Sequence, residues 1–328
     1  MLKSLFNRYL AIYKKFPAFT EMRDTYLTFK YTKMTSYKYY VLDVFTTERY
    51  KGNQLAVVFT GTDLELPVYE NIAREFGYSE TSFMYYSKEH KALKVRSFTP
   101  TGFEITGAGH NLLGAVCLAL LLDSDIFHEQ ENKQFVIMND EAIDLSVSYT
   151  NDHLPFVGMR QRPAIIGPPL DPKIIAGALT LNPDEILNEG IAASVVKTEV
   201  AHLMVPLKSV EILNKAVPEK ALLIELAVKY GFEGVYCFAI LNGDAAHFAQ
   251  ARFFNPGIGI DEDAATGSAA GPMAGLLFQK QLIQQNSAYQ VLQGVKMNHP
   301  STIKFEVTTE GIWISGSSVI VMEGMIHV

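Results

Sequence analysis

The chain contains one stretch of sequence twice. Residues 95–121 read VRSFTPTGFEITGAGHNLLGAVCLALL, and residues 251–277, which start 156 positions later, read ARFFNPGIGIDEDAATGSAAGPMAGLL. Aligned without a gap, both stretches carry the pattern Arg-x-Phe-x-Pro, beginning at Arg96 and Arg252, and both end in a pair of leucines. A segment repeated over this length constrains the chain to form two similar structural units.

A second segment recurs at nearly the same offset. Phe76-Gly77-Tyr78 stands between a helix-like and a strand-like stretch, and Tyr230-Gly231-Phe232 stands in the same setting 154 positions later. Two segments that recur in the same order predict a duplicated domain of about 155 residues, which fits the length of 328 residues. We expect an N-terminal extension over 1–36, a first domain over 37–150 that is completed by the last strand at about 317–328, and a second domain over 151–316.

Two segments that follow the repeated pattern are apolar on nearly every face. They are His110–Leu122 and Gly267–Phe278. A soluble helix of this kind is buried on all sides, so we expect each to lie inside a surrounding sheet. The sequence therefore predicts an α+β fold of two pseudo-symmetric domains. The expected strands are 37–46, 54–59, 81–86, 302–307, 312–315 and 318–322, and the expected outer helices are 67–76 and 218–230.

Composition favours a small molecule as the partner. The net charge is −7, and no cluster of basic residues with interleaved aromatics supports binding to nucleic acid. The longest uncharged apolar run has 11 residues, against about 20 needed to span a membrane. The two cysteines, Cys117 and Cys237, lie in apolar surroundings and are typical of a reducing compartment. We expect a cytoplasmic protein that binds neither nucleic acid nor membranes.

The first 33 residues contain seven Lys and Arg residues against Glu21 and Asp24. They lack the continuous apolar region and the small-residue cleavage site of a secretion signal. Three readings remain: an amphipathic arm, a transit-like extension, and translation from a start upstream of the domain, since Met34 stands just before the first expected strand.

Each expected central helix is preceded by small residues. These are Gly107-Ala108-Gly109 in the first copy and residues 264–268 (AATGS) in the second. Free N–H groups at a helix start, together with the positive end of the helix dipole, can hold an anion such as a carboxylate. The alternative is that the glycines only permit close packing of a central helix.

The two copies differ at ionisable residues. Glu80 in the first copy falls opposite Gly234, and Asp263 in the second falls opposite Gly107. A glutamate at the start of an apolar strand is a candidate acid/base with a raised pKa, unless it lies in an exposed turn. Asp263 is a candidate site residue or a helix cap, and His110 is a candidate site residue or a core histidine. No His, Cys or Asp grouping has metal-ligand spacing, and no serine-nucleophile or dinucleotide-binding motif occurs, so we expect no metal and no cofactor.

Several segments taken together resemble the phenazine-biosynthesis PhzF-like family over residues 37–328. They are DVFTTERYKGNQLAVVF, GYSETSFM, RSFTPTGFEITGAGHNLLGA, DEDAATGSAAGP and QGVKMNHPSTIKFEV, in this order. The resemblance implies the diaminopimelate-epimerase-like fold, in which two similar domains each wrap a β-barrel-like sheet around a central helix and the active site lies between them. It also implies isomerisation of a dihydro-hydroxyanthranilate by a hydrogen shift.

The resemblance assigns roles to individual residues. It makes Glu80 the group that moves the proton, and it makes His110, Asp263 and Ser268 residues that bind and polarise the substrate. Further substrate-binding residues are expected around them, namely Ser79, Gly109, Asn111, Thr266 and Gly267.

Two features distinguish the chain from its relatives. The related epimerases carry one catalytic cysteine at the start of each central helix, where this chain has Ala108 and Ala265 or neighbouring small residues, so a two-thiol racemase is excluded. Residues 105–108 (ITGA) and Asn298-His299 also differ from residues usual in the family, which points to a different substrate.

The leading hypothesis is therefore a cofactor-independent isomerase that acts on a small carboxylate-bearing substrate and forms a homodimer. One alternative is an amino-acid-type epimerase with Glu80 and Asp263 as its two bases. The other is a metabolite-binding protein that uses the same site without catalysis.

Overall fold

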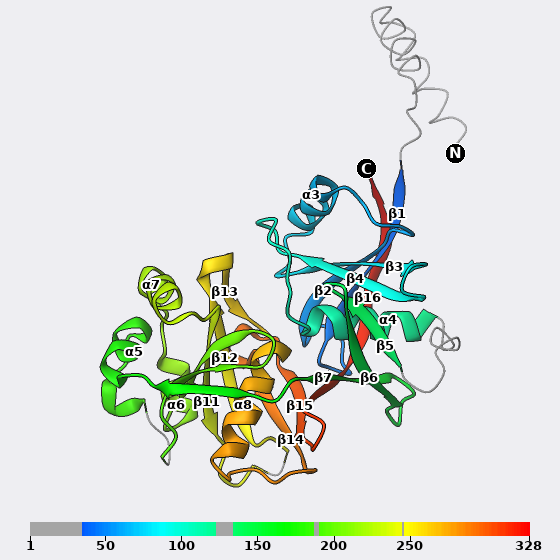
Figure 1. The fold of residues 1–328 in the computed structure, drawn as a ribbon. Coiled ribbons are helices and arrows are strands. Elements are labelled where there is room, and N and C mark those ends of the chain that lie inside the picture. Colours follow the sequence, from blue (N-terminus) through cyan, green and yellow to red (C-terminus); the bar gives the residue numbers. More distant parts are fainter. Residues whose placement is uncertain (1–34, 123–133, 187–189, 245) are drawn as a thin grey trace, which may run out of the picture. The chain divides into compact units, whose positions relative to one another are not determined.

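The computed structural model describes residues 35–122, 134–186, 190–244 and 246–328. Residues 37–325 form one compact unit (Figure 1). The expected N-terminal extension lies outside the described residues except for its last two positions. In the described ranges, no helix is long and apolar enough to cross a membrane.

The first half of this unit is a closed barrel. Its strands follow the order β1-β2-β3-β4-β5-β6-β7-β16, and a further pairing of β1 with β16 closes the circle. Helix α4 lies inside the barrel and α3 packs outside on β3 and β4 (Figure 1). The elements are β1 Ser36–Val44, β2 Asn53–Phe59, α3 Leu66–Phe76, β3 Thr81–Ser87, β4 Ala92–Phe98, α4 His110–Leu122, β5 Phe135–Met138, β6 Glu141–Tyr149, β7 Pro155–Gln161 and β16 Ile312–His327.

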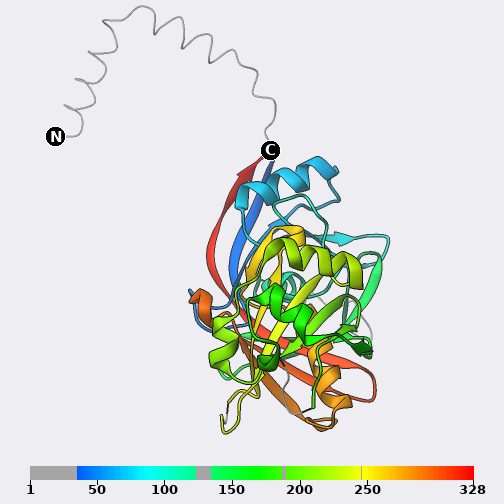
Figure 2. The same ribbon diagram turned by 90° about the vertical axis from the view of Figure 1, so that its left-hand side faces the viewer.

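The second half wraps a comparable sheet around α8. Its sheet runs from β7 and β16 through β15-β14-β12-β11-β10-β9 to β8, with β13 paired to β12. Helices α5, α6 and α7 cover its outer face (Figure 2). The elements are β8 Ile165–Pro169, α5 Pro172–Leu179, β9 Ser194–Lys197, β10 Ala201–Pro206, α6 Val210–Lys215, α7 Lys220–Tyr230, β11 Gly234–Ile240, β12 Ala249–Asn255, β13 Ile260–Asp263, α8 Gly267–Gln279, β14 Ala288–Gln293 and β15 Ser301–Val307, with short 3-10 turns at Pro183–Glu185, Pro256–Ile258 and Val295–Met297.

Strand registers confirm the duplication. In the first half Thr81 pairs with Phe98, and in the second half Val235 pairs with Phe254, which is the pairing that the two sequence offsets predict. Helices α3 and α7 both have 11 residues, and both end at a left-handed glycine, Gly77 in α3. The predicted α+β fold of two pseudo-symmetric units, each with a buried central helix, is confirmed.

The central helices are buried because they are apolar on every face. All residues of α4 from His110 to Leu120 are buried, and α8 is buried from Gly267 to Leu277 apart from Ser268. The predicted bounds of α4 are confirmed, and α8 is one residue longer than predicted. Side chains of both helices belong to one continuous apolar core, so the two halves are packed together as well as linked by the chain.

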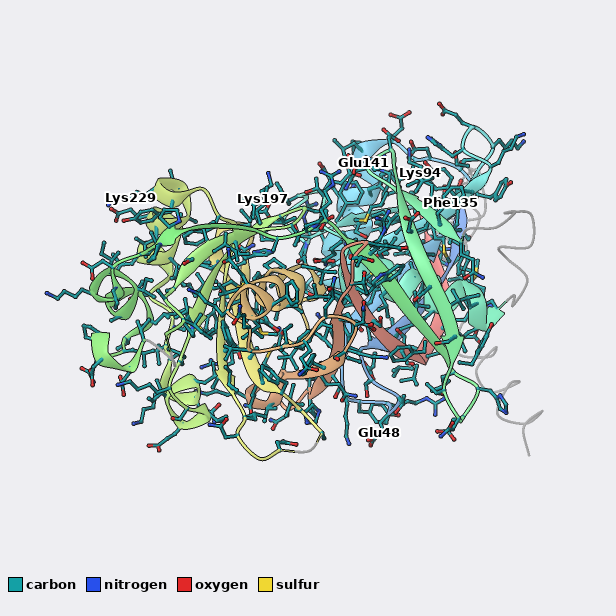
Figure 3. The ribbon with its side chains drawn as sticks, turned by 60° about the horizontal axis from the view of Figure 1, so that its bottom comes forward. Glu48, Lys94, Phe135, Glu141, Lys197 and Lys229 are labelled. Atoms are coloured by element: carbon teal, nitrogen blue, oxygen red, sulfur yellow. The ribbon has the colours of Figure 1, made fainter. Side chains whose placement is uncertain are left out.

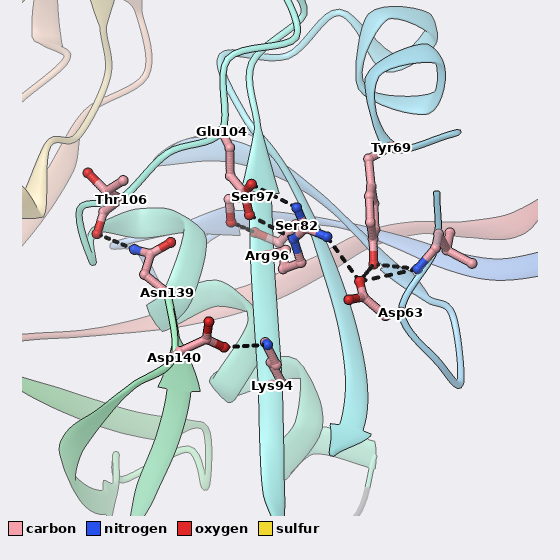
Figure 4. A network of polar contacts seen from close by, with 11 residues as sticks. Asp63, Tyr69, Ser82, Lys94, Arg96, Ser97, Glu104, Thr106, Asn139 and Asp140 are labelled. Atoms are coloured by element: carbon pink, nitrogen blue, oxygen red, sulfur yellow. Dashed lines mark hydrogen bonds and ion pairs between the residues drawn. The ribbon is translucent and has the colours of Figure 1, made fainter. Parts of the chain in front are cut away.

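A duplicated ion pair fixes the loop ahead of each central helix. Arg96 on β4 forms two bonds to the carboxylate of Glu104, of 2.7 and 2.8 Å, and Figure 4 shows the same guanidinium reaching Asp63. Arg252 on β12 forms two bonds to Glu262, both of 2.8 Å. Bidentate pairs of this kind hold the two groups in one geometry. The repeated arginine therefore anchors the segment that leads to each helix start.

The end of the chain differs from the sequence prediction. Two separate strands are expected at 312–315 and 318–322, but β16 runs without a break over Ile312–His327. The expected break at Gly316-Ser317 stays extended because these residues pair with Val157 and Phe156 of β7. A tertiary pairing thus overrides a local break signal.

Charged side chains lie on the outside of the unit. Figure 3 shows Glu48, Glu141, Lys197 and Lys229 pointing away from the ribbon, and all four are exposed. This distribution leaves the interior to apolar residues and to a small number of buried polar groups.

One buried polar group is His202, inside the second half. Leu203 pairs with Val235 and Ala56 pairs with Thr81, so His202 on β10 corresponds to Leu55 on β2. Neither ring nitrogen has a hydrogen bond of good geometry among the residues described. Burial lowers the pKa of His202 to about 3, and the nearby backbone of Gly234 opposes this change only in part.

Replacing His202 with leucine is expected to stabilise the protein by about 1–3 kcal/mol at pH 7, because an unpartnered buried polar group is lost. The contribution of His202 to stability should also fall as the pH drops below about 6.5, where the unfolded histidine binds a proton that the folded one does not, so the wild type should be more sensitive to acid than His202→Leu. Chemical denaturation between pH 4 and 8 measures both effects. The matched variant Leu55→His should destabilise, and an unchanged acid sensitivity in His202→Leu would contradict the prediction.

Candidate active site

Glu80 lies immediately before β3, at the rim of the first barrel. Its side chain is 12% exposed, and its Oε2 atom has no hydrogen-bond partner among the residues that the structure describes. The closest ionisable neighbour is His110, the first residue of α4, with 3.7 Å between Glu80 Oε2 and His110 Nδ1. This separation is too long for a hydrogen bond. The side chain is therefore largely buried, and its Oε2 atom lacks a hydrogen-bond partner in the described chain.

Burial sets the ionisation of both residues. It raises the pKa of Glu80 well above 4.5, and the negative charge of Asp263 raises this pKa further. Burial lowers the pKa of His110, and the charge of Asp263 opposes that change. At neutral pH the imidazole is therefore neutral, with Nε2 unpartnered in the described part of the chain. A carboxyl group whose pKa is raised by burial is suited to exchanging protons near neutral pH.

Asp263 ends β13, and both of its carboxylate oxygens accept hydrogen bonds. Asn53 Nδ2 donates to Oδ1 at 2.7 Å, and Thr266 Oγ1 donates to Oδ2 at 2.6 Å. Gln293 Nε2 in turn donates to Thr266 Oγ1 at 3.0 Å and to the Asp263 carbonyl at 2.9 Å. Asp263 is 5% exposed, so these donors replace the water that a carboxylate would otherwise bind.

The acidic residues ahead of α8 have three different partners. Asp261 forms an exposed ion pair with Lys220, and Glu262 forms the bidentate pair with Arg252 described above. Asp263 points inward to Asn53 and Thr266 instead. Simple complementarity to the helix dipole therefore does not account for Asp263.

The two central helices meet at their starts. A Cβ atom added to Gly267 would lie 3.3 Å from Gly109 Cα, and a Cβ added to Gly109 would lie 3.6 Å from Ser268 N and 3.8 Å from Gly267 N. These glycines therefore serve the close approach of the two backbones. The first backbone nitrogens of α8 therefore lie beside the start of α4.

The start of α4 is capped from within. Asn111 Oδ1 accepts hydrogen bonds from the N–H groups of Gly109 and Leu112, both at 2.8 Å, and Asn111 Nδ2 donates to the Gly107 carbonyl at 3.2 Å. The two helix starts are thus not equivalent, because the carboxamide of Asn111 already occupies part of one of them.

The second half has no counterpart of the Glu80 side chain. The corresponding residue is Gly234, and a Cβ added there would lie 2.2 Å from Phe253 Cζ. The residue that corresponds to Phe253 is Ser97, whose hydroxyl bonds to that of Ser82 at 2.8 Å (Figure 4). In the second half, the ring of Phe253 therefore fills the space beside Gly234. In the first half, the equivalent position carries the carboxyl group of Glu80.

Most of the residues predicted from the sequence lie close together. Glu80 and His110 are in contact, the charge of Asp263 acts on both, and the helix starts touch. The buried hydroxyl of Ser79, next to Glu80 in the chain, has no partner in the described ranges. The predicted residues at the two helix starts are Gly109, Asn111, Thr266, Gly267 and Ser268.

Sequence reasoning missed Asn53, Gln293 and Tyr236. Asn53 reads as a turn residue after Lys51-Gly52, although its partner Asp263 lies 210 positions away. Tyr236 is fully buried with no hydrogen-bond partner for its hydroxyl within the described chain, and burial with the charge of Asp263 raises its pKa. The sequence signal that could have identified Tyr236 is a difference between the two copies. Tyr236 and Phe253 stand at the positions where the first half has Ser82 and Ser97.

Comparison with known proteins agrees with the observed fold. Residues 42–324 match the family described as phenazine biosynthesis-like protein (PhzC-PhzF). A trans-2,3-dihydro-3-hydroxyanthranilate isomerase of Pseudomonas aeruginosa is 30% identical over 88% of this chain and 98% of its own length. The solved structure of a predicted epimerase of P. aeruginosa has a TM-score of 0.74 at 26% identity, covering 88% of this chain and 99% of that one.

A phenazine biosynthesis protein of Bacillus anthracis has the same fold, with a TM-score of 0.78 at 20% identity, over 90% of this chain and the whole of that one. The family match spans both halves of the duplication and includes every residue of the site described above. The chain belongs to the phenazine biosynthesis-like (PhzC-PhzF) family and is an enzyme of the isomerase class.

Proposed function

We propose that this isomerase moves a proton on a small carboxylate-bearing substrate without a cofactor, with Glu80 as the proton carrier. The observation that carries the proposal is the carboxyl group of Glu80, which is buried, unpartnered at Oε2 in the described chain and raised in pKa, and which only one of the two copies has. Such a group removes a proton from a carbon next to an unsaturated system and returns it to another carbon on the same face.

The remaining residues of the proposal hold the substrate and stabilise the charge that develops. The start of α8, with Gly267 and Ser268, offers N–H groups to a carboxylate. His110, neutral at pH 7, offers a single N–H donor, and Asp263 supplies a fixed negative charge that orients a polar substrate group. This division of roles between the halves explains why the two copies diverged at these positions.

The substrate class in this proposal is an unsaturated cyclic or open-chain carboxylate that carries a hydroxyl or amino group. Trans-2,3-dihydro-3-hydroxyanthranilate, on which the relative from P. aeruginosa is named as acting, is the first compound to test. Asn298-His299 departs from the usual family residues, and we therefore expect a related compound to be preferred.

Two observations favour this reaction over epimerisation by Glu80 and Asp263. Both oxygens of Asp263 already accept hydrogen bonds from the protein, so these oxygens are engaged in holding the carboxylate in place. The ring of Phe253 occupies the space beside Gly234, so the second half offers no glutamate-like base. One base that serves one face of the substrate suits a proton shift.

Incubation in deuterated water tests the proposal. We expect trans-2,3-dihydro-3-hydroxyanthranilate, or a carboxylate from a metabolite panel, to give a product with its double bonds shifted and deuterium at the receiving carbon, followed by NMR and mass spectrometry. Deuterium at the original carbon with inverted configuration would indicate an epimerase. Binding without exchange or product would indicate a metabolite-binding protein.

We also propose the domain boundaries, the cellular location and the oligomeric state of the enzyme. The proposal places the domains at 37–150 with the final strand, and at 151–316, with the substrate held between them. It describes the protein as a cytoplasmic homodimer. Sedimentation of the purified chain measures whether it forms a homodimer.

A further inference from the structure

Asn53 joins the two halves of the chain at the candidate active site. It is the first residue of β2, in the first half, and its Nδ2 atom donates to Asp263 Oδ1 at 2.7 Å and to the Ala265 carbonyl at 2.9 Å. Asn53 is 4% exposed. Both N–H groups of one carboxamide are thus directed at the segment that carries Asp263 into the start of α8.

The other contacts of Asp263 come from its own half. Thr266 Oγ1 donates to Oδ2, and Gln293 Nε2 donates to Thr266 Oγ1, so the Thr266 hydroxyl hydrogen is directed at the carboxylate. Thr266 and Gln293 hold one edge of the carboxylate against the second half. Asn53 holds the other edge and fixes its direction relative to the first half, where Glu80 and His110 lie.

The duplication supplies an internal comparison. Aligning β2 with β10 through their pairing with β3 and β11 makes Val200 the counterpart of Asn53, and Gly107 is the counterpart of Asp263. A Cβ added to Gly107 would lie 3.0 Å from Val200 Cγ2, so this pair also lies in contact across the two halves. At this equivalent position the two halves therefore meet through an apolar contact. The polar contact occurs only where the partner is a carboxylate of the candidate site.

We propose that Asn53 is a positioning residue, which acts by holding the Asp263 carboxylate in the direction that the reaction requires. The inference rests on the proposed function, since Asp263 is a substrate-orienting group only within it. It goes beyond that function by assigning a role to a residue of the other half that does not itself bear a charge. Small displacements of an orienting group can lower the rate by about 10²-fold.

The test compares Asn53→Val, which copies the apolar residue of the other half, with Val200→Ala as the matched control. We expect Asn53→Val to lower kcat/KM for trans-2,3-dihydro-3-hydroxyanthranilate, or for the substrate identified in the deuterium experiment, by about 10- to 100-fold. Val200→Ala should stay within about twofold of the wild type. Asn53→Ser, which keeps a shorter donor, should fall between them and serves if Asn53→Val does not fold.

Crystal structures of the variants provide a measurement that needs no substrate. We expect the Asp263 carboxylate to turn away from its wild-type direction in Asn53→Val and to keep it in Val200→Ala. The role of Asn53 would be overturned if Asp263 did not move in Asn53→Val, or if the kcat/KM of this variant stayed within twofold of the wild type. In that case Glu80→Gln would still lower turnover strongly. Failure of the proposed function has a different signature, because Glu80→Gln and Asp263→Asn would then leave turnover unchanged as well.

Discussion

Replacing Glu80 with glutamine is expected to lower turnover by about 10²- to 10⁴-fold, which is the usual contribution of a general acid/base. Glutamine keeps the size of the side chain and its capacity for hydrogen bonds but can no longer accept a proton. Substrate affinity should change little, because the proton transfer belongs to the transition state. Steady-state kinetics on the substrate found by deuterium exchange measures this, with the exposed Glu75→Gln on α3 as the control.

The same substitution is expected to stabilise the protein at neutral pH. The folded pKa of Glu80 is raised above the unfolded value, so between these two values the folded protein holds a proton that the unfolded chain has released. The contribution of Glu80 to the stability of the folded protein therefore falls as the pH rises above about 4.5, by about 1.4 kcal/mol for each pH unit, until the pH passes the folded pKa. Glu80→Gln lacks this loss.

Both effects must occur together for Glu80 to have the proposed role. Urea unfolding at pH 4, 6 and 8 should give nearly equal stabilities for the two proteins at pH 4 and a growing advantage for Glu80→Gln above it. A variant that turns over substrate at the wild-type rate would remove Glu80 as the proton carrier. A stability difference between Glu80→Gln and the wild type that did not depend on pH in this range would show that the carboxyl group is solvated in the folded protein.

The central helices and the duplication could be predicted because their signals are local or repeated. His110–Leu122 is apolar on every face, and this pattern has only one stable outcome in a water-soluble unit, which is burial inside other elements. The match of Arg96 to Arg252 carried structural information as well, since each arginine forms a bidentate pair with a glutamate ahead of a central helix, although the two glutamates do not stand at matching positions. The break expected at Gly316-Ser317 was wrong because pairing with β7 outweighs local propensity.

The candidate site was harder to predict where it depends on contacts between the halves. Glu80 could be predicted from the sequence because the corresponding residue of the second copy, Gly234, is a glycine. Asn53 could not, because nothing near Lys51-Gly52 reports a partner 210 residues away, and a polar residue at the start of a strand is common. Asn111 reads as a ligand-binding residue in the sequence, yet in the structure its carboxamide binds the backbone of its own helix.

The asymmetry between the halves leads to a prediction about Gly234. Replacing it with alanine is expected to destabilise the protein by about 1–3 kcal/mol, because the added Cβ would lie 2.2 Å from Phe253 Cζ and 3.1 Å from the Phe254 carbonyl oxygen. Phe253 is buried in the continuous core, so its ring cannot move aside without displacing other side chains. Gly177→Ala is the control, since a Cβ at that helical position meets no described atom within 4 Å and should stabilise by about 0.5–1 kcal/mol.

A double-mutant cycle then tests whether the ring itself fills the place of a second base. Phe253→Ala alone should cost about 3–5 kcal/mol by leaving a cavity. Combined with Gly234→Ala it should cost less than the sum of the two, by about 0.5–3 kcal/mol, because the clash disappears with the ring. Chemical denaturation of the four proteins gives the coupling. If the two costs simply add, the ring does not occupy the space beside Gly234. That space would then be open to a substrate. Epimerisation with one base from each half, Glu80 and Asp263, would become the better account of the site.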